Sequence, residues 1–161
     1  MARAWVLAGL LWAAPALAQE EPQPTPTEQP LKITSDYYGV APGSPGATQK
    51  KYEKPTLTWV GFQATDGGAR VFAQSNTSPQ VEQTVSGNEL IVSLGELALG
   101  ERNNLRPLDC RFFATDVARV WIKRRGKQTY LHVRMRDKVA PRKATQQIVS
   151  EGGMWLVLLD L

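Results

Sequence analysis

Apolar and polar residues alternate in short runs along the chain from residue 55 to its end. This period of two is typical of β-strands that bury one face, and turn-forming residues separate the runs. The pattern predicts strands at residues 56–64, 69–74, 80–85, 89–94, 119–124, 129–136, 144–150 and 154–161. No window has a convincing helical period. We therefore expect an all-β domain over residues 55–161, large enough to enclose a hydrophobic core.

The two halves of this region repeat one order of elements. Each half begins with a predicted hairpin, at residues 56–74 and at residues 119–136. A break, a strand, a Gly-containing turn and a strongly apolar strand follow in both halves. The amino-acid identity between the two halves is low, so the repeat lies in the order of the elements. The pattern predicts a sandwich of two similar antiparallel sheets with an internally duplicated four-strand unit.

The register of the second hairpin follows from its turn. If Gly126 and Lys127 form a two-residue turn, Arg125 lies opposite Gln128. Counting outward pairs apolar residues on one face: Ile122 with Leu131, Val120 with Val133, and Ala118 with Met135. The other face, which we expect to be exposed, pairs Lys123 with Tyr130, Trp121 with His132, and Arg119 with Arg134. A slip of one residue would mix the two sets, so the pattern supports this register.

The first 18 residues have the features of a secretory signal peptide. Arg3 precedes an apolar run from Val6 to Leu17, which ends in the small residues Ala16 and Ala18 that a signal peptidase reads. A membrane anchor is the alternative, but the run is shorter than the roughly 20 residues that a membrane span needs. We expect cleavage after Ala18 and a periplasmic protein.

Residues 19–54 differ in composition from the rest. Pro, Thr, Gln and Glu dominate this segment and apolar residues are sparse. Such a segment cannot bury enough surface to offset the entropy of ordering it, so we expect an extended, disordered tether. The exception is LKITSDYYGV at residues 31–40, where Tyr37 and Tyr38 could belong to a short docking strand or to a mildly apolar part of the tether.

Positive charge is concentrated in the second hairpin. Removal of Arg3 leaves 18 Lys and Arg residues against 15 Asp and Glu residues, a net charge of +3. Residues 117–143 carry ten of these cations and one acid, whereas residues 55–116 and 144–161 together carry four cations and nine acids. Basic charge suggests an anionic partner, and export makes nucleic acid a poor candidate. The anions outside the cytoplasm include lipid head groups, cell-wall polymers and acidic patches of proteins.

We interpret the exposed face of this hairpin as a binding surface for an anionic, sugar-containing polymer. Its cations would meet carboxylates, and its aromatic rings would stack on sugar faces. The candidate contact residues are Arg119, Trp121, Lys123, Tyr130, His132, Arg134 and Arg136. The alternative is a solvated sheet face whose Trp121 shields cross-strand hydrogen bonds. Binding to an anionic membrane is less favoured, because the face lacks exposed Leu or Phe side chains to insert.

Catalytic chemistry is not indicated. The chain has one histidine, His132, and one cysteine, Cys110, so a zinc site of the usual His and Cys type cannot form. No nucleophile elbow, Gly-rich phosphate loop or calcium loop is present. We expect no cofactor and no enzyme activity. Cys110 has no intramolecular partner, and we expect a buried thiol beside Leu108, Phe112 and Phe113.

Several segments resemble the AMIN domain family. They are residues 56–94, the connector NNLRPLDCRFF at residues 103–113 and the ending GGMWLVLLDL at residues 152–161. AMIN domains precede periplasmic N-acetylmuramoyl-L-alanine amidases and type IV pilus secretins. The resemblance implies a fold of two similar β-sheets and a non-catalytic module that binds peptidoglycan and places envelope machinery. It supplies no residue motif for binding.

The resemblance leaves the partner open. Relatives of this kind carry the domain beside an amidase or secretin domain, whereas this chain ends at Leu161, so we expect a free-standing module. Peptidoglycan is the first candidate partner. The second interpretation is an accessory protein of a secretin, pilus or amidase assembly, which would dock by strand addition through a sheet edge or through residues 31–40.

Overall fold

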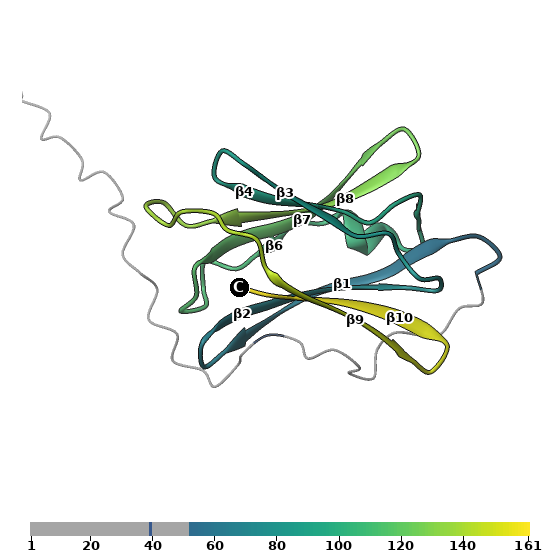
Figure 1. Cartoon of the computed structure of the whole chain (residues 1–161), viewed down its shortest axis with the longest axis horizontal. Coiled ribbons are helices and arrows are strands. Elements are labelled where there is room, and N and C mark those ends of the chain that lie inside the picture. The colour runs from purple at the N-terminus through teal and green to yellow at the C-terminus, as the bar shows by residue number, and fades with distance from the viewer. Residues whose placement is uncertain (1–38, 40–51) are drawn as a thin grey trace, which may run out of the picture.

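The computed structural model describes residue 39 and residues 52–161. The predicted signal peptide and most of the predicted tether therefore lie outside the described residues. The described part is all-β, as the alternation of residues predicts, with ten strands in two mainly antiparallel sheets and one short 3-10 helix (Figure 1). Tyr52 and Lys54, at the end of the predicted tether, already contact the domain, because their carbonyl oxygens accept hydrogen bonds from Asn76 Nδ2.

The first sheet has the strand order β5-β1-β2-β10-β9. Its members are β1 (Thr56–Thr65), β2 (Gly68–Ser75), β5 (Ala98–Leu99), β9 (Thr145–Glu151) and β10 (Met154–Asp160). All neighbours pair antiparallel except β5, which pairs in parallel with the beginning of β1.

The second sheet has the order β3-β4-β8-β7-β6 and is antiparallel throughout. Its members are β3 (Glu82–Ser86), β4 (Glu89–Ser93), β6 (Leu108–Asp109), β7 (Val117–Arg125) and β8 (Gln128–Met135). The predicted strands are thus all present. The connection from residue 95 to residue 116 contains three short elements that the sequence did not predict, namely β5, β6 and the 3-10 helix η1 (Arg102–Leu105).

Each sheet combines hairpins from both halves of the domain. The β1–β2 hairpin pairs with β10 of the β9–β10 hairpin, and the β7–β8 hairpin pairs with β4 of the β3–β4 hairpin. Chain segments that are far apart in sequence therefore hold each sheet together. This arrangement places β7 and β8 in the middle of the second sheet, between β4, which carries Glu89, and β6, which carries Asp109.

The two sheets share one hydrophobic core. They face one another in Figure 1, and buried side chains from both contribute to a single cluster. Val71 of β2, Leu159 of β10 and Val133 of β8 are fully buried members. Burying a side chain of this size contributes about 1.5–3 kcal/mol. Cys110 is also buried in this cluster, which confirms the expected buried thiol, and burial raises the pKa of the thiol to about 12.

Candidate functional site

The β7–β8 hairpin has the predicted turn and, over most of its length, the predicted register. Gly126 has φ +61°, and Arg125 lies opposite Gln128. The apolar pairs Ile122–Leu131 and Val120–Val133 are confirmed, and all four side chains are buried. On the opposite face the pairs Lys123–Tyr130, Trp121–His132 and Arg119–Arg134 are confirmed as well. We call the side of the second sheet that carries these last three pairs the outer face.

One predicted pair is wrong. Met135 lies opposite Val117 and not opposite Ala118, because the register shifts between Val117 and Arg119. A β-bulge of this kind inserts one extra residue into one strand. Here the carbonyl oxygen of Ala118 accepts a hydrogen bond from the backbone N–H of Cys110, at 2.9 Å. The bulge therefore helps to attach the connection that follows β6 to the edge of β7.

The outer face is less uniformly basic than the hairpin alone suggests. β4 places Glu89 beside Arg134, and β6 places Asp109 beside Arg119. One row across four strands therefore reads Glu89, Arg134, Arg119 and Asp109, with acids flanking two cations. Glu89 Oε1 accepts a hydrogen bond from Arg134 Nη2 at 2.6 Å. Asp109 Oδ2 accepts one from Nη2 of the neighbouring Arg111 at 2.8 Å.

His132 is buried, contrary to the expected exposure of this face. Its exposed fraction is 6%, because the side chain is enclosed by neighbours on both adjacent strands. Trp121 stacks on the imidazole ring, with ring centroids 5.0 Å apart. Nδ1 of His132 lies 3.1 Å from Oε2 of Glu89, and Ile91 is its cross-strand neighbour on β4. His132 therefore packs against one face of the Trp121 ring and leaves little exposed surface of its own for a ligand.

Glu89 and Arg134 complete this support. Burial by itself raises the pKa of the Glu89 carboxyl, but hydrogen bonds from Arg134 and His132 outweigh burial and hold the pKa below its ordinary value. The Arg134 guanidinium also lies 5.5 Å from the centroid of the Trp121 ring, a cation–π distance. The charge of Arg134 is thus shared between a carboxylate and an aromatic ring.

Arg119 and Lys123 are cations of the face that lack a direct polar partner, although Asp109 of β6 is the cross-strand neighbour of Arg119. Both side chains are exposed, and neither forms a hydrogen bond or an ion pair with the described part of the chain. They lie on β7 on either side of Trp121, each two residues from it, which is about 7 Å along a strand. Tyr130, opposite Lys123, is partly exposed. Arg119, Trp121, Lys123 and Tyr130 are therefore accessible, and so is Arg134, whose side chain is 51% exposed although it pairs with Glu89.

Arg136 lies outside this group. It follows the last residue of β8, and its Nη2 donates hydrogen bonds to the carbonyl oxygens of Arg111 and Phe113, at 2.8 and 2.6 Å. Its backbone N–H donates to the carbonyl oxygen of Asp116. Arg136 therefore holds the loop between β6 and β7 in place, and the sequence alone could not distinguish this role from ligand contact.

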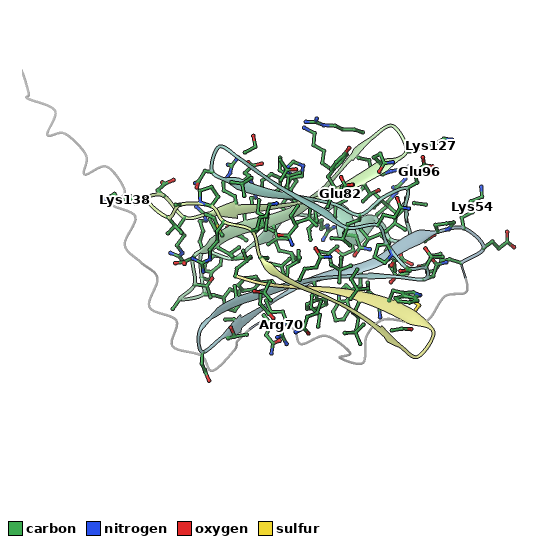
Figure 2. The ribbon with its side chains drawn as sticks, in the orientation of Figure 1. Lys54, Arg70, Glu82, Glu96, Lys127 and Lys138 are labelled. Carbon is green, nitrogen blue, oxygen red and sulfur yellow. The ribbon has the colours of Figure 1, made fainter. Side chains whose placement is uncertain are left out.

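The first sheet presents a different surface. Arg70 of β2 is the single Lys or Arg on its described strands, and it pairs with Asp160 of β10, with Nε and Oδ1 2.6 Å apart. Figure 2 places Arg70 on the side of the first sheet that faces away from the second, and Lys127 at the tip of the β7–β8 hairpin. The unpaired positive charge is thus concentrated on the second sheet and its hairpin tip.

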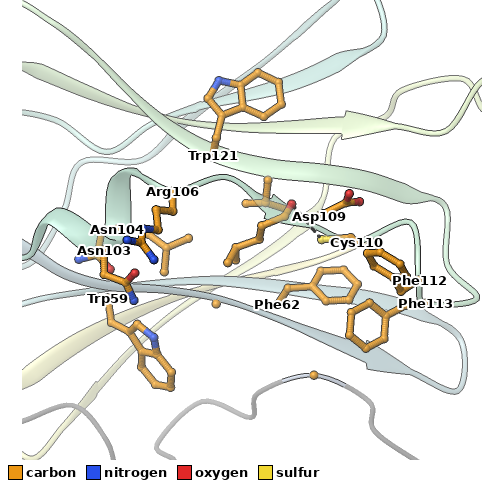
Figure 3. Close-up of a pocket in the computed structure, with 15 residues that line it drawn as sticks. Trp59, Phe62, Asn103, Asn104, Arg106, Asp109, Cys110, Phe112, Phe113 and Trp121 are labelled. Carbon is orange, nitrogen blue, oxygen red and sulfur yellow. Dashed lines mark hydrogen bonds between the residues drawn. The ribbon is translucent and has the colours of Figure 1, made fainter. Parts of the chain in front are cut away.

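A cleft that sequence analysis missed lies on the side of β7 opposite to the Trp121 ring, toward β1. It has a volume of about 480 Å³ and is lined by residues of β1, η1, the β6–β7 connection and β7 (Figure 3). Phe62, Phe112 and Phe113 form its apolar end, and Asn103, Asn104 and Arg106 its polar end. Trp121 belongs to its β7 side, with the ring pointing away from the cleft. Little in the sequence indicated this cleft, because the connection between β4 and β7, which forms much of its lining, has no hydrophobic periodicity.

Residues 39 and 52–161 contain no group of three or more His, Cys, Asp or Glu side chains that could hold a metal ion. Nor does this part of the chain include a helix with the length and apolar character that a membrane span requires. A scan against protein-family models finds no match for the chain, and a search of curated proteins finds none either.

Proposed function

We propose that this chain is a non-catalytic, peptidoglycan-binding module of the periplasm that positions envelope machinery, and that the outer face of the second sheet is its contact surface. One observation carries the proposal. Arg119 and Lys123 flank Trp121 on the outer face, and neither forms a hydrogen bond or an ion pair within the described part of the chain. Cations left exposed beside a supported aromatic ring are suited to an anionic ligand with flat apolar faces.

Peptidoglycan has the matching chemistry. Its stem peptides carry carboxylates, and a guanidinium such as that of Arg119 can bind a carboxylate through two parallel hydrogen bonds. Its sugar rings offer faces of C–H groups against which Trp121 and Tyr130 can pack. His132, Glu89 and Arg134 fix the orientation of Trp121 in advance, which lowers the entropy cost of binding.

The strand order supports the AMIN resemblance on which this proposal also draws. We propose that the fold is a β-sandwich with an internal duplication in which β1 to β4 correspond to β7 to β10. When each strand is replaced by its counterpart, and β5 by β6, the order β5-β1-β2-β10-β9 becomes β6-β7-β8-β4-β3. That is the order of the second sheet. The short edge strands depart from the symmetry, since β5 is parallel to β1 and β6 is antiparallel to β7.

Co-sedimentation with purified peptidoglycan sacculi tests the function. The exported chain, residues 19–161, should pellet with sacculi at low salt and remain in the supernatant at high salt, because exposed charge pairs are screened. A chain that stays in the supernatant at both salt concentrations would overturn wall binding.

The second candidate function is docking to another protein of a secretin, pilus or amidase assembly. The observation that favours it is the exposed edge strand β9, on which Ile148 and Val149 are each 41% exposed. Apolar side chains on both faces of an edge strand are suited to strand addition by a partner. A chain that fails to bind sacculi but is retained by a purified secretin domain would favour this alternative.

A further inference from the structure

The edge of β1 that faces away from β2 is paired over a small part of its length. β5 pairs with Thr56 and Leu57, and Nδ2 of Asn104 donates a hydrogen bond to the carbonyl oxygen of Thr58, at 2.9 Å. From Trp59 onward, the described residue that pairs with this edge is Gly39, which forms an isolated antiparallel bridge with Gln63. A residue 24 positions before Gln63 thus reaches the free half of β1.

Gly39 fits this edge because it has no side chain. A Cβ atom at residue 39 would lie 2.4 Å from the carbonyl oxygen of Phe62, which is closer than a Cβ atom can approach. Its φ of +96° also lies in the region that favours glycine. The close approach of the two backbones is therefore specific to this residue.

The same contact shows which backbone groups face the free edge. The carbonyl oxygen of Phe62 points toward Gly39, and alternate residues of a strand direct their N–H and C=O groups to the same side. Phe62 and Ala64 therefore present their N–H groups to the free edge, whereas Gly61 and Gln63 direct theirs to β2. Unpaired strand edges bind further strands readily.

The cleft lies beside this edge and provides apolar surface for side chains of an added strand. Gly39 and Phe62 both line it, and the Phe62 ring packs against that of Phe113 with centroids 5.0 Å apart. Phe112, at the same end of the cleft, is 47% exposed. Edge and cleft together form a groove that is suited to an extended segment with aromatic or β-branched residues.

We propose that residues 37–41 of this chain, Tyr-Tyr-Gly-Val-Ala, bind in this groove as an added strand antiparallel to Gly61–Thr65. The Gly39–Gln63 bridge sets the register, in which residue 37 lies opposite residue 65 and residue 41 opposite residue 61. Tyr and Val have high strand propensity. Pro42 then ends the pairing, because it has no N–H group to donate. Covalent attachment gives this segment a high effective concentration at the groove compared with any partner.

The proposal is independent of wall binding and changes the expected reach of the tether. If residues 37–41 are docked on β1, the part of the exported chain that can extend freely is residues 19–36 and not residues 19–54.

Residue-resolved amide hydrogen exchange by NMR on the exported chain tests the proposal. Gly39→Val should accelerate exchange at Phe62 and Ala64 by about tenfold or more, as expected for the loss of local protection. Gly61 and Gln63, whose N–H groups face β2, should be unchanged and so report that the domain remains folded. Gly67→Val is the matched control, because a Cβ atom there has no neighbour within 4 Å.

Two results would overturn the proposal. The first is fast exchange at Phe62 and Ala64 in the unaltered chain. The second is slow exchange at both residues that persists in Gly39→Val and also after deletion of residues 31–43. The deletion matters because it removes the whole proposed strand without placing a new side chain against β1.

Discussion

The indole ring of Trp121 lies nearly parallel to the imidazole ring of His132, with ring centroids 5.0 Å apart and planes inclined by 17°. Glu89 lies behind this pair and contacts both His132 and Arg134 through its two carboxylate oxygens. His132 therefore holds Trp121 in place and does not itself offer a contact surface. The proposed binding surface consists of the exposed side chains around this pair.

Replacement of Glu89 should weaken the support and change how stability depends on pH. Glu89→Gln removes the ion pair with Arg134, and we expect the free energy of unfolding at pH 7 to fall by about 1–2 kcal/mol. The pKa of Glu89 in the folded chain lies below its ordinary value of 4.5. The ionised carboxylate therefore stabilises the fold above that pH, and this stabilisation is lost as the pH falls through the folded-state pKa.

Urea unfolding of both proteins between pH 3 and pH 7 measures this effect. The difference in unfolding free energy between the original chain and Glu89→Gln should shrink toward zero at the acidic end. A difference that stays constant across the range would show that the charge of Glu89 does not stabilise the fold.

Arg136 and Arg119 should have opposite roles, although both were candidates for ligand contact. Arg136→Met removes two hydrogen bonds to the β6–β7 connection and should lower the free energy of unfolding by about 1–2 kcal/mol, with sacculus binding retained. Arg119→Met should change stability by less than about 0.5 kcal/mol and should strongly reduce binding. Thermal unfolding and co-sedimentation of the two variants check this. Equal effects of the two changes on binding would mean that net charge alone matters.

Cys110 should be unreactive in the folded protein. Its side chain is 1% exposed, and burial, with a smaller effect of Asp109, raises the pKa of the thiol to about 12. A thiol reagent at pH 8 should therefore react at least about a hundredfold more slowly with the native chain than with the chain unfolded in urea. Rapid labelling without denaturant would show that the connection after β6 opens easily.

The hairpin register was predictable because it depends on local signals. Gly126 fixes the turn, and the alternation from Arg119 to Arg125 admits one register that separates apolar from polar side chains. The bulge at Ala118 was not predictable, since it depends on a hydrogen bond from Cys110, eight positions earlier. The connection between β4 and β7 has no period, so its short strands and the cleft that it lines were missed.

The environment of the outer face was not predictable either, because it also depends on segments that are distant in the sequence. The acids that compensate it come from β4 and β6, and nothing in the hairpin sequence shows which strands will be its neighbours. Glu89 is 43 positions from His132 in the sequence but shares a hydrogen bond with it in the fold. Burial of His132 and the engagement of Arg134 both follow from that pairing. The alternation of residues in the hairpin therefore predicted which side chains share the outer face. Which of them are accessible depends on the order of the strands in the sheet.

Co-sedimentation of two double variants with sacculi at low salt tests whether the outer face binds the wall. Arg119→Gln with Lys123→Gln removes the two cations that flank Trp121 on the outer face. Lys54→Gln with Arg102→Gln removes two exposed cations elsewhere and lowers the net charge by the same amount. We expect the first variant to remain in the supernatant and the second to pellet like the original chain. Equal pelleting of the two variants would contradict the claim that the outer face binds the wall.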